Sequence, residues 1–406
     1  MTPLRIVYVW DADYPWDVRT EKSCLALTAA GHDVHIIARN KKWSAPVEQL
    51  PEGTVHRIAP FRWAGRKLDN ALGFPAFFNP RWINLLSNTV KETSADVIIV
   101  RDLPLCPTAI HVGRRLGVPV VFDMAENYPA LMRALWETNR ATWLDWFVRN
   151  PKAVVRVEEY SVKNVEHTIV VVEESAWRLF EMGVPESEVT LVSNTPFTTR
   201  ISESPAPSWT PKDHIDIVYL GNIEVVRGML ESIEAIAKLR ADGHDVRLRL
   251  IGKGRDNELV QNHARSLGLG PDSVEFLGYI PNHKDALAIV ASADIGLMPH
   301  QRCELWNTTI PNKMFDYMAA GLPVLSSDAA PCARILGETG AGVIFKSKDS
   351  TDIANAVVKL KDAELRKQIG QAGQRAIREK YNWEADSALF VRTVEDATHA
   401  YKQRHA

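Results

Sequence analysis

The chain has 406 residues, of which 46% are hydrophobic and 24% charged, with a formal net charge of −2 and a pI near 6.6. This length exceeds one typical core and predicts two domains. The charge balance excludes the broadly basic surface that nucleic-acid binding usually leaves. The four cysteines are far apart and form no CxxC pair, so we expect ordinary buried thiols, and neither disulfides nor a metal site, in a reducing cytoplasm.

The first residues, MTPLRIVYVWDAD, lack a basic segment followed by a long apolar run. We interpret them as the first strand of a sheet and not as a signal peptide. No uncharged apolar run of about 18 residues follows anywhere in the chain. We therefore expect no membrane-spanning helix.

Short β-rich runs alternate with helical patterns along the whole chain. Several runs are apolar without alternation, which is typical of strands covered on both faces. The strands predicted in the first half are residues 5–10, 34–38, 97–100, 118–122, 168–172 and 189–192. Those predicted in the second half are residues 215–220, 247–251, 274–277, 295–298, 323–326 and 342–345.

This alternation predicts two α/β domains, each a doubly wound, Rossmann-like parallel sheet with helices on both faces. Residues 202–212 carry three prolines and no apolar periodicity, so we expect a linker there. It would join domains at residues 1–201 and 213–383, and a final helix at 384–406 would follow. Ligands bind such sheets at the carboxyl ends of the strands, so two facing domains would form a cleft.

Residues 299–328, PHQRCELWNTTIPNKMFDYMAAGLPVLSSD, carry the clearest chemical signal. Polar residues gather just before a predicted helix and a lysine, namely Asn307, Thr308, Thr309, Asn312 and Lys313. Backbone N–H groups, hydroxyls, a helix start and a fixed cation together stabilise an anion. The segment therefore predicts a phosphate-holding site at the carboxyl end of a parallel sheet.

The run PNKMFDYMAAGLPVLSSD resembles the donor-binding segment of the retaining family 4 glycosyltransferases (glycosyl transferases group 1). Four more segments occur in the order that this family uses: GNIEVVRG at 221–228, LIGKG at 250–254, FLGY at 276–279 and ADIGLMP at 293–299. Each segment alone is weak, but five in order are specific. The resemblance covers the C-terminal half well and the N-terminal half more loosely. It implies a GT-B fold and a nucleotide-sugar donor.

The resemblance assigns two cations to the leaving diphosphate. The family places a positive pair after the first strand of its C-terminal domain, and here those positions are Asn222 and Arg227, followed by Gly228. Asn222 supplies no charge, whereas a guanidinium forks onto phosphate. Lys313 is the second cation. The alternatives are a solvated arginine at a helix start and a surface lysine.

The resemblance also assigns the remaining donor contacts. Asp316 stands where the family holds the ribose, and Thr308 replaces the acid that contacts the transferred sugar. Gly254 belongs to a GKG turn that would let the nucleotide approach the backbone, and Tyr279 would border the base. The other expected donor contacts are Gly221, Asn222, Gly228, Thr309 and Asn312.

The N-terminal half would bind the acceptor. The segment VFDMAENYP resembles a family motif written DxHExxP, with Asp123 and Glu126 in place and Ala125 at the histidine position. Glu126 is our candidate for contact with the acceptor hydroxyl, and Arg19, Asp102 and Asp123 are further acceptor-side candidates. Loop capping is the alternative for Glu126 and Asp102, and a helix-surface charge for Arg19. The DxD at residues 11–13 lies in the first loop of a doubly wound domain, so we expect no metal.

Residues 61–86 combine aromatic side chains with arginines and a lysine. Such a mixture suits an anionic membrane surface or a lipid-linked acceptor. Core packing with a solvated rim is the alternative. We expect a cytoplasmic protein that contacts the inner face of the membrane through this tract.

The function implied by the resemblance is retaining glycosyl transfer from a nucleotide-sugar to a carbohydrate or lipid-linked acceptor, in surface glycan synthesis. No metal or other cofactor is implied. Because Asn222, Thr308 and Ala125 depart from the family pattern, a non-catalytic nucleotide-sugar-binding partner subunit is an alternative. A sugar-nucleotide epimerase on the same fold is another. The base, the sugar, the acceptor and the oligomeric state are not predicted.

Overall fold

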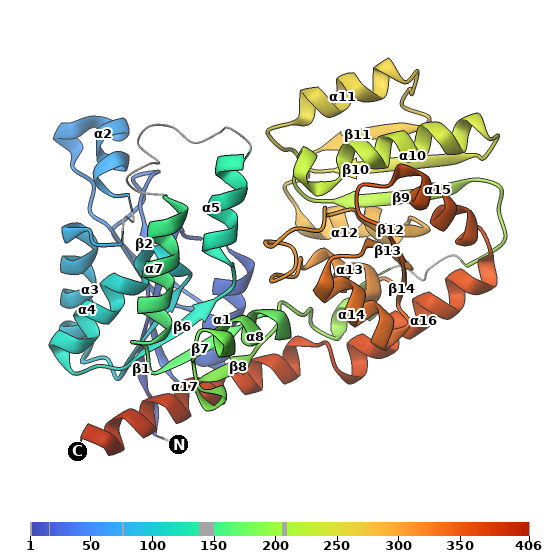
Figure 1. The fold of residues 1–406 in the computed structure, drawn as a ribbon. Helices are drawn as coiled ribbons and strands as arrows, with labels where there is room; N and C mark the ends of the chain where they lie inside the picture. The colour runs from blue at the N-terminus through green and yellow to red at the C-terminus, as the bar shows by residue number, and fades with distance from the viewer. Residues whose placement is uncertain (1, 16, 75–76, 138–149, 205–208, 406) are drawn as a thin grey trace. The chain divides into compact units, whose positions relative to one another are not determined.

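The computed structural model describes residues 2–15, 17–74, 77–137, 150–204 and 209–405. The chain divides into two compact α/β units (Figure 1). The N-terminal unit comprises residues 1–193 and 386–406, and the C-terminal unit comprises residues 194–385. The linker expected at 202–212 therefore falls within the C-terminal unit, and its residues 205–208 lie outside the described part of the chain.

The N-terminal unit is built on one eight-stranded sheet in the order β3-β4-β2-β1-β5-β6-β7-β8. All neighbouring pairs are parallel except β3 with β4. The central strands are apolar and buried on both faces, as in β5, where all five residues are buried. The strands are β1 (Arg5–Asp13), β2 (Asp33–Arg39), β3 (Val47–Leu50), β4 (Gly53–Arg57), β5 (Val97–Arg101), β6 (Val120–Met124), β7 (His167–Val170) and β8 (Val189–Leu191).

Helices cover this sheet and supply one contiguous apolar core, in which Trp82, Leu86 and Phe122 are fully buried. Side-chain caps fix several helix starts; Asp17 accepts a hydrogen bond from the N–H of Thr20, for example. The helices are α1 (Val18–Ala29), α2 (Gly65–Leu72), α3 (Pro80–Thr93), α4 (Cys106–Leu116), α5 (Tyr128–Glu137), α7 (Pro151–Val162) and α8 (Glu173–Glu181), with short 3-10 turns η1 (Arg62–Ala64), η2 (Leu103–Leu105) and η3 (Glu186–Glu188).

The C-terminal unit contains a fully parallel six-stranded sheet in the order β11-β10-β9-β12-β13-β14. Its strands are β9 (Ile215–Leu220), β10 (Val246–Ile251), β11 (Val274–Gly278), β12 (Ile295–Met298), β13 (Val324–Ser327) and β14 (Gly342–Phe345). Its helices are α9 (Thr199–Glu203), α10 (Met229–Ala241), α11 (Asn257–Ser266), α12 (His283–Ala291), α13 (Lys313–Ala319), α14 (Ala330–Thr339), α15 (Ser350–Lys359) and α16 (Ala363–Glu379), with the 3-10 turn η4 (Val225–Arg227).

The last helix, α17 (Trp383–His405), belongs to the N-terminal unit from residue 386 onward. Lys402 forms an ion pair with Asp96 at 2.6 Å, and His32 Nε2 lies 3.4 Å from Glu395. Arg404 pairs with Glu166. Polar contacts therefore hold the end of the chain against strands and loops of the first unit.

All twelve predicted strands form, and the prediction of two doubly wound parallel sheets is confirmed. The sequence reading missed β3 and β4, an antiparallel edge pair whose outer strand is largely exposed. The cysteines are free, but Cys303 is exposed, contrary to the expectation of buried thiols.

Candidate active site

The C-terminal unit brings three separate segments together where parallel strands β9, β12 and β13 end. Turn η4 follows β9, the loop after β12 begins at Pro299, and α13 precedes β13. Gly228 makes the first contact possible: a Cβ at this position would lie 1.9 Å from the carbonyl oxygen of Pro299, and its φ is +72°. Only glycine suits this position, so Gly228 lets η4 close against the end of β12.

Helix α13 is fixed to the same strand ends by Tyr317. The backbone N–H of Leu220 donates to the Tyr317 hydroxyl at 2.9 Å. The ring occupies space that a side chain at Gly296 would fill, because a Cβ there would lie 2.4 Å from it. These contacts explain the glycine in the ADIGLMP segment, and they orient the start of α13.

Lys313 is the first residue of α13 and is only 7% exposed. Its Nζ is buried and makes no hydrogen bond to any residue that the structure describes. It lies over the Tyr219 ring, 4.1 Å from the centroid. Burial, and then the neighbouring Arg227 guanidinium, lower the pKa of Lys313 well below its ordinary value. A buried cation without a partner is costly, so this position favours an anion.

Gly221 leaves the space around that ammonium group open. A Cβ at Gly221 would lie 2.7 Å from Lys313 Nζ, and φ there is +142°. Any larger residue would occupy the position that a ligand oxygen could take. Gly221 and Lys313, predicted from separate motifs, are therefore brought together.

Arg227 belongs to a cluster with His300 and Trp306. Its guanidinium lies 5.0 Å from the Trp306 ring centroid and its Nε donates to Glu224 at 3.2 Å. Arg227 Nη1 lies 3.3 Å from His300 Nε2. Because arginine only donates, His300 Nε2 must accept, and the proton of the neutral ring belongs on Nδ1.

His300 is 2% exposed, and its Nδ1 is buried without a hydrogen-bond partner in the described chain. Burial first, then Lys313 and Arg227, lower the pKa of His300 well below its ordinary value. The ring therefore stays neutral and offers one unused N–H. Neither His300 nor Trp306 was singled out from the sequence, where only their position in the loop after β12 would have indicated them.

The other predicted donor-side residues surround this cluster less closely. Asn222 is exposed, and its carbonyl oxygen accepts a hydrogen bond from Tyr219. A Cβ at Gly254 would lie 2.0 Å from the Ile223 carbonyl oxygen, so this glycine permits close packing of two loops. Tyr279 is 65% exposed after β11.

Thr308 and Thr309 lie in the loop before α13. The Thr308 hydroxyl donates to the Glu304 carbonyl at 2.9 Å, and Thr309 is buried. Asn312 is exposed and Asp316 is half-buried. Helix α13 has only seven residues, so we assign the positive charge near this loop to the side chains of Lys313 and Arg227 and not to the helix start.

In the N-terminal unit, Arg19 and Asp123 form a buried ion pair, with exposed fractions of 4% and 0%. Arg19 Nη2 and Nε donate to Asp123 Oδ1 at 2.6 and 3.0 Å. Tyr8 donates to Asp123 Oδ2 at 2.8 Å, and Arg19 Nη1 donates to the Val192 carbonyl at 3.2 Å. The pair joins α1 to the end of β6. Direct contact of either side chain with an acceptor stays a prediction.

Asp102 follows β5 with φ 59° and ψ 168°, a region populated almost only by glycine. Its Oδ1 accepts from the Ala125 N–H at 3.2 Å, which ties it to the segment that holds Glu126. Burial raises the pKa of Asp102 to about 8; Arg101 opposes the rise, and Glu126 and Asp11 add to it. A buried carboxyl in a strained backbone is typical of functional sites. Glu126 itself is half-buried beside it.

The DxD residues have local structural contacts. Asp13 Oδ1 accepts from the Lys41 N–H at 2.7 Å, and burial raises the pKa of Asp11. Across the described residues, no three His, Cys, Asp or Glu side chains gather as metal ligands would.

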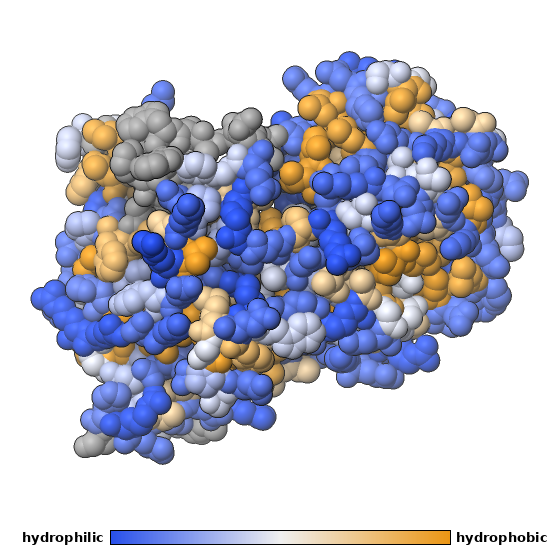
Figure 2. Space-filling view, viewed as in Figure 1, coloured by the Kyte–Doolittle hydropathy of each residue, from blue (hydrophilic) through white to orange (hydrophobic). Residues whose placement is uncertain are grey.

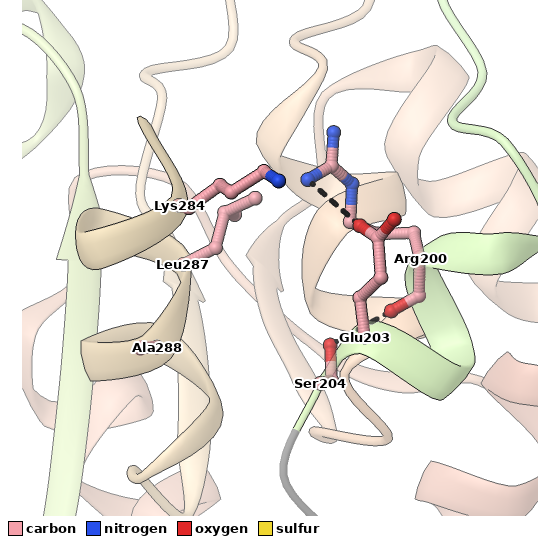
Figure 3. A pocket seen from close by; sticks show the side chains of 6 residues that line it. All are labelled: Arg200, Glu203, Ser204, Lys284, Leu287 and Ala288. Atoms are coloured by element: carbon pink, nitrogen blue, oxygen red, sulfur yellow. Dashed lines mark hydrogen bonds and ion pairs between the residues drawn. The ribbon is translucent and has the colours of Figure 1, made fainter. Parts of the chain in front are cut away.

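A separate cavity of about 270 Å³ lies in the C-terminal unit between α9 and α12 (Figure 3). Arg200 and Glu203 of α9 pair at 3.5 Å on one side, and Lys284 and Leu287 of α12 lie opposite. None of the residues around Lys313 lines it. We assign it no part in the chemistry.

The predicted membrane tract, residues 61–86, is divided between core and surface. Trp82 and Leu86 are buried in the core, whereas Trp63 is 79% exposed, and residues 75–76 lie outside the described chain. Figure 2 shows a small group of apolar side chains over the α2 region. None of the helices, over the residues described, has the length and apolarity needed to cross a bilayer.

Two doubly wound sheets, with a buried cation at the strand ends of the second, define a class of fold. Solved structures share it. Sucrose-phosphate synthase from Thermosynechococcus elongatus is similar over 98% of this chain and 100% of its own, with a TM-score of 0.76 and 17% identity. HepE from Anabaena, in complex with UDP, is similar over 97% and 100%, with a TM-score of 0.71 and 13% identity. The fold is the GT-B fold.

Sequence comparison gives the family. Residues 17–195 match the model "Glycosyl transferase 4-like domain", and residues 214–362 match "Glycosyl transferases group 1". The chain belongs to the group 1 glycosyltransferase family, and the resemblance noted from the motifs is confirmed.

Two curated relatives show a low sequence identity to this chain. A phosphatidyl-myo-inositol mannosyltransferase of Mycolicibacterium smegmatis is 27% identical over 227 residues, which is 55% of each chain. A glycogen synthase of Mycobacterium tuberculosis is 21% identical over 381 residues, covering 88% of this chain and 85% of its own. The match to the mannosyltransferase spans about half the length of either protein.

Proposed function

We propose that the chain transfers a glycosyl group, with retention, from a nucleotide-sugar to a carbohydrate or lipid-linked acceptor in surface glycan synthesis. The buried Lys313 Nζ without a hydrogen-bond partner in the described structure carries the proposal. A diphosphate oxygen at this position would supply the missing charge. The similarity to HepE in complex with UDP supports a nucleotide-sugar as donor.

In the proposed reaction, the sugar–phosphate bond breaks and negative charge develops on the leaving diphosphate. Lys313 and Arg227 neutralise this charge, and fixed cations in a water-poor site are efficient because they need no reorganisation. His300 offers its Nδ1–H as a neutral third donor. The leaving phosphate takes the proton of the incoming hydroxyl on the same face, so no protein nucleophile and no metal are needed.

The other donor-side residues would orient the substrate. We assign Asp316 to the ribose, Thr308 and Thr309 to the phosphate and sugar, and Tyr279 to the base. The backbone around Gly221, Asn222, Gly228, Gly254 and Asn312 would line the site. On the acceptor side we assign Glu126 and Asp102 to the hydroxyl-bearing group, with Arg19 and Asp123 holding the segment that carries Glu126.

Calorimetric titration of UDP, GDP and ADP tests the donor site. We expect selective binding of one nucleotide, loss of binding in Lys313→Ala, and normal binding in Lys359→Ala, where the lysine is exposed on α15. If all three nucleotides fail to bind, the proposal is wrong. Release of the bound nucleotide from its sugar conjugates, with acceptor extracts present, then tests turnover.

One observation favours a second candidate, a partner subunit that binds nucleotide-sugar without turnover. Thr308 replaces a carboxylate of the family pattern, and its hydroxyl donates to the Glu304 carbonyl. This candidate predicts nucleotide binding with no transfer under any condition. Thr308→Glu would then create activity, whereas in an active enzyme it would only change the preferred sugar.

We also propose that the protein works in the cytoplasm and contacts the inner face of the membrane through residues 61–86. The exposed Trp63 and the basic residues of the tract support this. Cosedimentation with anionic liposomes at low salt is the test. Equal recovery of wild-type protein and Trp63→Ser in the pellet would contradict the assignment to this tract.

A further inference from the structure

A cavity of about 340 Å³ lies within the N-terminal unit. It is bordered by Asp11 of β1 and by Arg39 at the end of β2, with Pro104 after β5 and Tyr128 after β6. The sheet order β2-β1-β5 places strands β2 and β5 on opposite sides of β1. The cavity therefore occupies the switch point of a doubly wound sheet, where such folds bind their ligands.

Much of the cavity lining is apolar. Leu131, Met132 and Leu135 of α5 line it together with Val154 of α7, Phe74 and Phe77. Aliphatic and aromatic side chains from three parts of the chain thus converge on one space. A bare sugar here would lose water from its hydroxyls and gain no hydrogen bonds from these side chains.

The lining also carries charge. Arg39 and Lys41 both border the cavity, and Asp11 is the carboxyl group among the residues that line it; Asp13 and Asp69 act on Arg39 from outside the lining. The Arg39 Nε is buried and makes no hydrogen bond within the described chain, and the guanidinium lies 5.6 Å from the Phe74 ring centroid. Burial raises the pKa of Asp11, and Arg101, Arg39 and Lys41 act against that rise. A wholly apolar ligand would leave the Arg39 donor unused.

We propose that this cavity binds an amphiphilic acceptor in which a phosphate group adjoins an apolar chain. The phosphate would contact Arg39 Nε and Lys41, and the first part of the chain would lie against Phe77 and the α5 wall. At 340 Å³ the cavity is near the lower end of ordinary ligand sites, so the rest of a long chain would extend outside. This inference rests on the proposed transferase function, since it names the acceptor class.

Three probes separate the ligand chemistries: decyl phosphate, decyl β-D-glucoside and glucose 1-phosphate. Each is titrated by calorimetry, the two decyl compounds below their critical micelle concentrations. We expect decyl phosphate to bind at least roughly tenfold more tightly than either other probe, which corresponds to about 1.4 kcal/mol. Equal binding of glucose 1-phosphate would show that the apolar wall contributes nothing, and equal binding of decyl glucoside that the cations contribute nothing. Either result overturns the proposal.

The chain offers two matched pairs of variants. Phe77 borders the cavity, whereas neighbouring Phe78 does not and is 57% exposed. Lys41 borders it, and neighbouring Lys42 does not. Phe77→Ala and Lys41→Ala should each weaken decyl phosphate binding by roughly five- to tenfold, with Phe78→Ala and Lys42→Ala unchanged. Equal loss in the control variants would overturn the assignment to this cavity.

Nucleotide titration of the same preparations separates this inference from the proposed function. Normal nucleotide binding without decyl phosphate binding overturns the acceptor class and leaves the donor site intact. Loss of decyl phosphate binding in Phe77→Ala with unchanged nucleotide affinity supports the cavity, because the folded donor site is then demonstrated.

Discussion

Each unit buries a basic side chain, but the groups around that side chain differ between the two units. In the N-terminal unit, Arg19 is surrounded by acceptors: both oxygens of Asp123 and the carbonyl of Val192. In the C-terminal unit, Lys313 is equally enclosed, yet its ammonium group lies over the face of Tyr219 and makes no hydrogen bond to a described residue. In the first arrangement the protein supplies the partners of the charge, whereas in the second no described residue forms a hydrogen bond with it.

The difference shows how buried charges can be interpreted. A paired charge has recovered part of its lost hydration from the protein, so removing one partner destabilises the fold. An unpaired charge has not, so we expect the folded protein to tolerate its loss. Burial alone therefore does not indicate a functional residue; a buried charge without a partner, beside other site residues, makes a stronger candidate.

The largest expected effect is on the paired charge. Asp123→Asn leaves Arg19 buried without a carboxylate and should lower the free energy of unfolding by about 3–5 kcal/mol, measured by urea denaturation. The double variant Arg19→Met with Asp123→Leu should recover much of this loss, because no lone charge remains. A double variant no more stable than Asp123→Asn would show that the pair contributes specific geometry beyond charge balance.

Lys313→Ala should lower activity without lowering stability, the reverse of Asp123→Asn. We expect turnover to fall by about 10²–10³-fold, as for other fixed donors to a developing negative charge, with thermal stability unchanged or higher. Steady-state kinetics and the melting temperature of the same sample measure both. Near-normal turnover would remove Lys313 from the mechanism and end the comparison.

Asp102 extends the comparison of buried charges to a buried carboxyl group. Burial raises the pKa of Asp102 in the folded protein to about 8, whereas its ordinary value is near 4. The protonated carboxyl group therefore contributes its full stability below about pH 4, and this stability is lost as the pH rises toward about 8. Asp102→Asn should remove a slope of up to about 1.4 kcal/mol per pH unit from the unfolding free energy between these values. Denaturation at several pH values, with the exposed Asp33→Asn as control, measures it. Parallel curves for wild type and Asp102→Asn would contradict the raised pKa.

We expect the smallest effect at His300, which would influence donor binding through its contact with Arg227. His300→Phe keeps the ring volume but removes the acceptor for Arg227 Nη1 and the free Nδ1–H, so the KM for donor should rise roughly tenfold, or about 1.4 kcal/mol. His300→Gln restores an acceptor and should recover part of the loss. If both variants lose the same affinity, accepting a hydrogen bond from Arg227 is not the role of His300.

Some features followed from short stretches of sequence. The twelve strands were readable because buried parallel strands are continuous apolar runs, and the cation at residue 313 was readable from its motif. The edge strands β3 and β4 were not, since their residues are partly polar and their pairing is set by the turn between them. The role of Gly296 also became clear only when the Tyr317 ring was found against it.

The sequence by itself therefore determined the fold class, the family and the position of the lysine to which we assign the phosphate, because these depend on residues close together in the chain. Tertiary structure decided which charges are paired. Asp123 meets a partner 104 positions away in Arg19, and Arg227 meets His300 across 73 positions. Residues so far apart in the sequence meet because of the order of the strands in each sheet. The local periodicity of a sequence does not reveal that order.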